Sequence, residues 1–446
     1  MRFLRLAVLG CGLLAFDLAS NSQVTAITHA RLIDGTGAAP VEDATILIEG
    51  RTIKAIGDAA LKVPTGARIL DAQGQSVLPG LADLHVHLVG GWDGENTDIL
   101  GYQNYMNALL YAGVTTVLDT GNVPPFVLQL RAAIANGQVL GPRIYCVGPL
   151  IDGADPFWGP ISVALTSRSQ VPKVVSQLAA EKVDLVKLYA GLSDLQVREI
   201  SAEAQKMNLR TVIDQGRRNG SMDLMNEGIA GFAHLPFNRI SDDAVKLAKD
   251  KHIFFISTLA VQEFLFGRRL RDLRFMDAPL IADTMPPSQR KALLTESQKP
   301  IKPEDQQRYD AALAKFQSAE SNVKRLWDAG VLIAAGTDAP YPGDSQGEGL
   351  HRELELLVES GLTPMQAIQA ATRNAALVLH AESEWGTLEP GKLANMILVH
   401  GHPDQEISQS RRITAVIKEG RVLDRDKLKF SSTSIDFPVL VNVSTP

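Results

Sequence analysis

The chain alternates short apolar segments with longer amphipathic segments over most of its length, and this alternation limits the folds that it can adopt. The apolar segments have the length of buried strands, as at residues 77–84, 183–189, 231–234 and 331–338. Amphipathic stretches that predict helices follow or precede them, at residues 194–207, 222–229, 242–250 and 318–329. Strands that alternate with helices form parallel sheets. This many repeats predict an α/β protein with a (β/α)8 TIM-like barrel.

The predicted strands end in side chains that bind metals or protons. His85 and His87 are two residues apart, so both imidazoles point to the same side of an extended strand. Lys187, His234 and Asp338 lie at the ends of later predicted strands. In a (β/α)8 barrel the carboxyl ends of the strands carry the chemistry, so these side chains are predicted to meet there. Neutral imidazoles and carboxylates are ligands of divalent metals, and the pattern predicts a metal site.

The first 22 residues have the pattern of an export signal peptide. Arg2 and Arg5 precede an apolar run over residues 6–16, and small residues follow it. That run is too short to span a membrane, and too little apolar sequence precedes Cys11 for a lipoprotein anchor. We therefore expect a periplasmic or secreted protein with no integral membrane span, in which Cys146 is the remaining thiol and no internal disulfide forms.

The two ends of the chain predict a second, smaller domain. The 446 residues exceed the roughly 250 that a barrel needs. Residues 23–75 and 384–430 both contain short alternating strands, and the turn tripeptide Glu-Gly-Arg occurs in each. We predict a composite β-sandwich domain built from both termini, with the barrel at residues 76–383 between its halves and a tail at 431–446. The net charge of −6, with both signs dispersed, argues against a nucleic-acid partner.

Residues 264–317 depart from the barrel pattern. They are rich in charge, contain Pro286, Pro287 and Pro300, and are longer than an ordinary barrel loop. We predict a helical insertion over the barrel mouth that acts as a lid.

Several motifs resemble the amidohydrolase superfamily of metal-dependent hydrolases, in the branch that includes imidazolonepropionases and Xaa-Pro-type dipeptidases. The matching segments are Pro79–His87, Val186–Tyr189, Ala233–His234, Gly336–Ala339, Leu362–Ala367 and Gly386–Ala394. The resemblance extends from about residue 24 to about residue 424. The motifs are specific for the superfamily and much less specific for a substrate.

The resemblance implies a binuclear site that holds two divalent metals, zinc with manganese as an alternative. His85, His87 and Asp338 would bind the first metal, and His234 the second. Lys187 would be carbamylated by carbon dioxide and bridge both metals, since burial near cations favours the reactive neutral amine. A hydroxide held between the metals would attack the scissile carbonyl, and Asp338 would pass its proton to the leaving nitrogen.

The fifth predicted strand departs from the family pattern, which has a histidine there. This chain has Asp214 or Ile213 at that position, depending on the direction of counting, and a strand buried on both faces does not settle which side chain points inward. Three interpretations remain open. Asp214 replaces the histidine as a ligand, because carboxylate oxygen binds zinc and suits manganese. Alternatively the second metal is absent or weak, or the chain has lost the chemistry.

Substrate contacts are suggested by position alone. Tyr189 shares its side of the strand with Lys187, and its hydroxyl could polarise a carbonyl. Arg217 and Arg218 follow the fifth strand, where a guanidinium could clamp a substrate carboxylate. Two tryptophans on loops at the active end, Trp92 and Trp158, could line an apolar pocket. His351 lies close to the barrel mouth, and we expect it at a solvent-facing helix position.

Together these features predict an exported, metal-dependent hydrolase of C–N bonds. We expect a peptide or N-acyl amino acid substrate with a terminal carboxylate, as a dipeptidase or carboxypeptidase would take. Hydrolysis of a cyclic amide or lactone is the alternative among enzymes. The alternative of another class is a binding protein that kept the barrel after losing catalysis. The expected partners are a small-molecule or dipeptide substrate and a second copy of the chain in a homo-oligomer.

Overall fold

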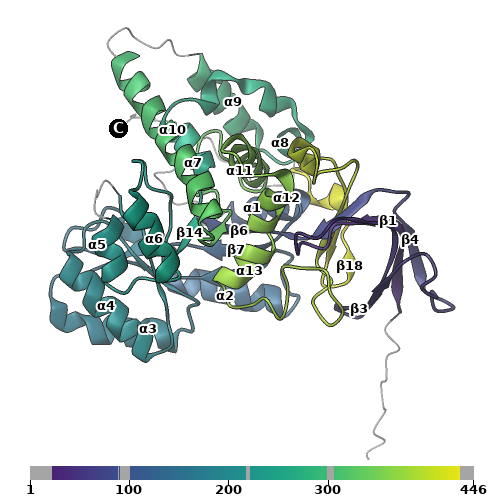
Figure 1. Ribbon diagram of the computed structural model, residues 1–446, viewed down its shortest axis with the longest axis horizontal. Coiled ribbons are helices and arrows are strands. Elements are labelled where there is room, and N and C mark those ends of the chain that lie inside the picture. The colour runs from purple at the N-terminus through teal and green to yellow at the C-terminus, as the bar shows by residue number, and fades with distance from the viewer. Residues whose placement is uncertain (1–22, 89, 91–100, 217–220, 299–305, 432–446) are drawn as a thin grey trace, which may run out of the picture.

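A computed structural model of the protein describes residues 23–88, 90, 101–216, 221–298 and 306–431, and Figure 1 shows its two parts, a barrel ringed by helices and a β-sheet beside it. The predicted signal peptide and the tail from residue 432 lie outside the described residues, as do Trp92, Arg217 and Arg218. No helix within the described ranges is both long and apolar enough to cross a membrane.

The predicted (β/α)8 barrel is confirmed. Its strands in chain order are β6 (Leu81–Val86), β7 (Val114–Asp119), β8 (Arg143–Cys146) continued by β9 (Leu150–Asp152), β11 (Val186–Leu188), β12 (Thr211–Ile213), β13 (Gly231–Phe232), β14 (Phe254–Ile256) and β15 (Ile333–Ala334). Neighbouring strands pair in parallel. The barrel closes between its last and first strands, where Leu84 N–H donates to Ala335 O at 3.0 Å and Asp338 N–H donates to His85 O at 2.7 Å.

Helices cover the outside of the barrel. They are α1 (Tyr102–Tyr111), α2 (Pro124–Ala135), α3 (Val171–Ala180), α4 (Asp194–Lys206), α5 (Ser221–Asn226), α6 (Asp242–Asp250), α10 (Gln306–Asp328), α11 (Glu348–Glu359) and α12 (Pro364–Ala370). By contrast, α13 (Arg373–Val378) packs against the inward-facing apolar side chains of the strands. Serine and threonine side chains start several of them, because a hydroxyl there accepts a hydrogen bond from the first turn; Ser193, Ser241 and Thr363 do so. The helix predicted at residues 318–329 begins earlier, at Gln306.

The strand interiors settle which side chains face the middle of the barrel. Leu185 and Val212 belong to an apolar cluster with residues of the other barrel strands, whereas Val186, Leu188 and Ile213 pack with the surrounding helices. Side chains alternate along a strand, so the residues that follow Val212 and Leu185 by two point inward as well. These residues are Asp214 and Lys187.

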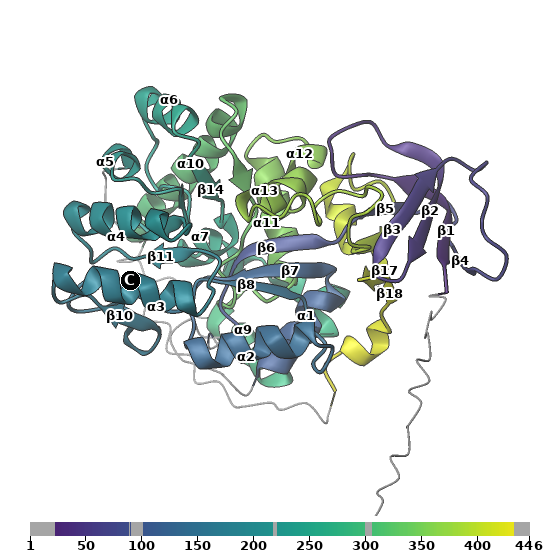
Figure 2. The ribbon, with the colours of Figure 1, turned by 90° about the horizontal axis from the view of Figure 1, so that it is seen from below.

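The composite domain at the chain termini is also confirmed. Its strands are β1 (Thr25–Leu32), β2 (Val41–Glu49), β3 (Thr52–Gly57), β4 (Arg68–Asp71), β5 (Ser76–Pro79), β16 (Met396–Val399), β17 (Ile413–Lys418) and β18 (Arg421–Val422). Within the described residues they form one connected mixed sheet, and β16 joins the two halves by pairing with β5. Figure 2 shows β17 and β18 beside the amino-terminal strands. The two Glu-Gly-Arg turns meet, since Arg51 and Glu419 form an ion pair at 2.9 Å.

The insertion is helical where the structure describes it. After α7 (Leu259–Leu265) come η3 (Arg269–Arg271), η4 (Leu273–Asp277), α8 (Pro279–Ala282) and α9 (Pro287–Ser297). The buried Arg269 attaches the base of the insertion to the barrel rim. The Arg269 guanidinium donates to Glu348 at 2.8 Å and to Gly343 O at 3.1 Å. Farther along, Asp283 accepts a hydrogen bond from Tyr111 of α1. The insertion is therefore anchored at two places, and its action as a lid stays a prediction. The remaining short elements are β10 (Ser162–Ala164), η1 (Gly159–Ile161), η2 (Arg168–Gln170), η6 (Ile407–Arg411) and η7 (Arg425–Leu428).

Candidate metal centre

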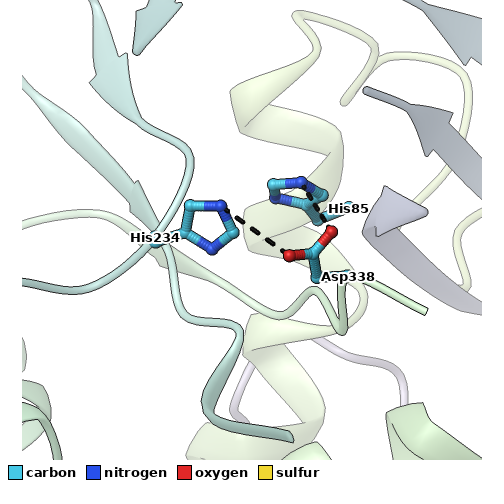
Figure 3. A group of neighbouring side chains, drawn as sticks. All are labelled: His85, His234 and Asp338. Carbon is cyan, nitrogen blue, oxygen red and sulfur yellow. Dashed lines mark ion pairs between the residues drawn. The ribbon is translucent and has the colours of Figure 1, made fainter. Parts of the chain in front are cut away.

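The predicted metal ligands meet at the carboxyl end of the barrel. Ligand atoms of His85, His234 and Asp338 all lie within 4.8 Å of one another, and Figure 3 shows both imidazoles turned toward the carboxylate. His87 approaches the same carboxylate oxygen as His85, with Nε2 at 3.0 Å from Asp338 Oδ1. The three histidines and Asp338 come from the first, sixth and eighth strands, far apart in sequence.

The outer nitrogens of the histidines are held by the protein. Nδ1 of His85 lies 2.9 Å from Ala233 O, and Nδ1 of His87 lies 3.3 Å from Gly121 O. A carbonyl oxygen only accepts hydrogen bonds, so each Nδ1 carries the hydrogen and each Nε2 keeps its lone pair. Nδ1 of His234 is bonded to Thr258 Oγ1 at 2.7 Å. Metal-binding histidines are oriented by such outer partners.

The inner faces of these side chains present lone pairs to one another. Nε2 of His85 lies 3.3 Å from Asp338 Oδ1, and Nε2 of His234 lies 3.9 Å from Asp338 Oδ2. Burial, and next the charge of Lys187, hold the pKa of His85 well below its usual value, so its imidazole is neutral. Neutral nitrogen and carboxylate oxygen donors that converge on one point are the ligand set that divalent transition metals take. The residues present therefore fit a divalent metal.

Lys187 and Asp214 complete the cluster. The buried Lys187 amine lies 2.9 Å from His85 Nε2, and burial lowers its pKa against the opposing effect of nearby carboxylates. Asp214 points inward, with Oδ2 at 3.3 Å from His234 Nε2. Burial alone would raise the pKa of Asp214, but its neighbours His234 and Lys187 and a hydrogen bond from Gly216 N–H hold this pKa well below its usual value. Of the two residues that counting along the strand left open, Asp214 is the one that faces the site.

Several supporting residues were missed by the sequence reasoning. Asp83 is buried and accepts hydrogen bonds from Thr337 N–H at 3.0 Å and Thr337 Oγ1 at 2.7 Å, which fixes the residue before Asp338. Asp83 precedes His85 by two residues and so lies on the same side of the strand, which is the sequence signal that could have identified it. The buried Asp119 accepts a hydrogen bond from Gly121 N–H and so holds the carbonyl that His87 uses. Thr258 had no signal in the sequence.

Of the residues predicted to contact substrate, the structure describes only some. Tyr189 lies on the inner side of the barrel rim, and its hydroxyl accepts a hydrogen bond from Trp158 Nε1 at 2.9 Å. Arg217 and Arg218 fall in residues whose placement is not described. The expectation that His351 faces solvent is wrong. Its ring is buried and bonded to Ser410 Oγ and Ala112 O, because α11 packs this face against η6 and the end of α1.

The barrel and its convergent histidine and carboxylate donors define a metal-dependent barrel enzyme, and comparison with known proteins supplies the family. The model of the amidohydrolase family matches residues 76–423, and the chain belongs to this family. It is accordingly a metal-dependent amidohydrolase that hydrolyses C–N bonds.

Known relatives resemble the chain over most of its length. An ochratoxinase from Aspergillus niger is 23% identical over 456 aligned positions, with 90% of this chain and 87% of the relative covered. An imidazolonepropionase from Brevibacillus brevis is 25% identical, with 86% and 90% covered. Among solved structures, a Xaa-Pro dipeptidase with bound methionine in its active site superposes with a TM-score of 0.73 at 22% identity, covering 90% of this chain and all of that one. The likeness to this structure shows the shared fold.

Proposed function

We propose that the protein is an exported amidohydrolase that cleaves a peptide or N-acyl amino acid bond. The observation that carries the proposal is the convergence of imidazole Nε2 atoms on Asp338, with each outer nitrogen already bonded to the protein. Burying so many polar side chains together costs folding free energy, and this cost is expected where the side chains hold a metal for catalysis. Export rests on the amino-terminal pattern of Arg2, Arg5 and the apolar run that follows.

The same cluster supports a binuclear centre of two zinc ions, with manganese as the alternative. His85, His87 and Asp338 would hold one cation, while His234 and Asp214 would hold the other. A carbamylated Lys187 would bridge them, since its burial favours the neutral amine, whose lone pair attacks carbon dioxide with release of a proton. The carboxylate of Asp214 stands at the position for which the family resemblance implies a histidine, and its inward orientation supports catalysis over the binding-protein alternative.

Each protein group then has a task in hydrolysis. Bound divalent cations supply a water of lowered pKa as the nucleophile and polarise the scissile carbonyl. Asp338 lies between the histidines, so it is placed to take the proton of that water and deliver it to the leaving nitrogen. The Tyr189 hydroxyl accepts its bond from Trp158 and is left to donate to the substrate carbonyl oxygen. Arg217 or Arg218 would pair with the terminal carboxylate of the substrate.

Metal content per chain is the decisive first measurement. The mature protein is expressed with zinc or manganese and added bicarbonate, analysed by elemental analysis, and assayed on dipeptides and N-acyl amino acids for release of free amino acid. Two equivalents with amino acid release are expected. One equivalent would replace the binuclear centre by a mononuclear one, and none would overturn the proposal. A His29→Ala variant, changed at an exposed histidine of β1, is the matched control and should retain its metal.

A further inference from the structure

Three aromatic side chains, one of them largely exposed to solvent, lie in contact at the same end of the barrel as the proposed metal centre. The side chain of Phe157 is 73% exposed, on the loop between β9 and β10 at the catalytic end of the barrel. Its ring meets Trp158 edge to face at 4.9 Å and lies nearly parallel to Tyr189, with ring centroids 6.3 Å apart. An isolated exposed apolar side chain is ordinary on a protein surface, but three aromatic rings in contact at a catalytic rim are not isolated.

Buried hydrogen bonds hold this group in place. The Asp152 side chain is buried, and its Oδ2 accepts from Phe157 N–H at 2.9 Å. Its Oδ1 accepts from Gly191 N–H at 2.9 Å, which lies on the loop after Lys187 and Tyr189. The loop that carries Phe157 is thus tied to the loop that follows the fourth strand. Aromatic surface that is fixed before binding loses little conformational entropy when a ligand arrives.

The group is continuous with the metal centre. Tyr189 is two residues from Lys187 on the same side of its strand, and Trp158 donates the hydrogen bond that orients the Tyr189 hydroxyl. A substrate whose carbonyl reaches Tyr189 therefore extends its next group toward the rings of Trp158 and Phe157.

We propose that Phe157 and Trp158 form a subsite that selects substrates with a planar aromatic group next to the scissile bond. Offset and edge-to-face contacts between aromatic rings add affinity beyond the area they bury. The inference rests on the proposed function and narrows its substrates to aromatic N-acyl amino acids and dipeptides.

The test compares N-acetyl-phenylalanine with N-acetyl-leucine in wild type and in Phe157→Ala, with calorimetric binding measured beside kcat/KM. We expect wild type to prefer the aromatic compound and Phe157→Ala to lose about tenfold in kcat/KM for it, with less than about threefold loss for the leucine compound. Phe157→Trp should keep the preference. Ile69→Ala, at an exposed apolar residue of β4, should change neither compound.

The outcomes separate this inference from the proposed reaction. A wild type without aromatic preference, or a preference that survives in Phe157→Ala, overturns the subsite. Selective calorimetric binding of the aromatic compound that Phe157→Ala abolishes supports the subsite even if no compound is hydrolysed, and in that case the proposed reaction is the part that fails.

Discussion

The two sides of the metal centre hold their side chains by different means. The first side, called the seam, comprises residues 83–87 at the end of the first strand and residues 335–339, which follow the last strand. Main-chain hydrogen bonds fix the seam. Asp338 N–H donates to His85 O at 2.7 Å and His87 N–H donates to Ala339 O at 2.9 Å. The same main-chain hydrogen bonds that close the barrel therefore fix the positions of the proposed ligands His85, His87 and Asp338.

The second side, called the arc, comprises Lys187, Asp214, His234 and Thr258. Here the side chains are oriented by hydrogen bonds and ion pairs with other side chains. His234 follows its strand and is oriented by the Thr258 hydroxyl from the next strand. The segment around Thr258 is in turn held by the buried Glu353 of α11, whose Oε2 accepts from Ala260 N–H at 2.7 Å. The seam is fixed by the fold itself, whereas the arc depends on particular residues.

The largest effect is expected where seam and arc meet. Asp338→Asn should lower kcat/KM about a thousandfold or more, because it weakens a ligand and removes the group that transfers the proton. Steady-state kinetics on the best substrate of the panel provide the measurement, with circular dichroism as the control for folding. Activity within tenfold of wild type would remove Asp338 from the proposed mechanism.

Replacing Asp214 isolates the arc. Asp214→Ala should reduce the metal content from two equivalents to one, because the cation on the His234 side loses its carboxylate. Asp214→His should restore two and, after dialysis against equal zinc and manganese, favour zinc more than wild type does, since imidazole suits zinc and carboxylate suits manganese. Elemental analysis measures the metal content of both variants. If Asp214→Ala keeps two equivalents, Asp214 is no ligand.

Thr258→Val tests the outer support of the arc. Valine has the same shape but cannot bond Nδ1 of His234, and losing such a partner typically costs 10–100-fold in metal affinity. Competition with a chelator should therefore show about that weakening for one of the two metals. Thr258→Ser keeps the hydroxyl and serves as the control. Equal weakening of both metals would contradict the separation of arc from seam.

Thr337→Val makes the corresponding change in the seam. It leaves Asp83 Oδ2 buried without the hydroxyl at 2.7 Å, which costs about 1–3 kcal/mol of unfolding free energy. Urea unfolding measures this loss, and Thr337→Ser should retain most of the stability. Because the main-chain bonds of the seam remain, the first metal should still bind. A variant as stable as wild type would show that Asp83 is satisfied in another way.

The same contrast explains how much of the protein the sequence could predict. The barrel followed from the alternation of strands and helices, and His85, His87 and Asp338 from motifs at strand ends. The orientation of Asp214 did not follow, because its strand is apolar on both faces and pattern alone gives no inside or outside. Thr258 bonds a histidine that follows the neighbouring strand, and Glu353 bonds the same region from a helix; no local spacing in the sequence encodes either contact. His351 was misplaced for a related reason, since the segment that covers it comes from the far end of the chain.

The last predicted effect concerns the pH dependence of stability that Glu353, the support behind the arc, contributes. Burial raises its pKa from 4.5 to about 8, so between these values the folded state keeps a proton that the unfolded state has lost. The folded state binds more protons there, and stability must fall as pH rises, by at most about 1.4 kcal/mol per pH unit from this group. Glu353→Gln does not titrate, so its unfolding free energy should fall less steeply than that of wild type between pH 5.5 and 7.5 in urea titrations. Parallel pH dependences would mean that Glu353 is ionised in the folded protein, with Ser257 and Ala260 as its stabilising donors.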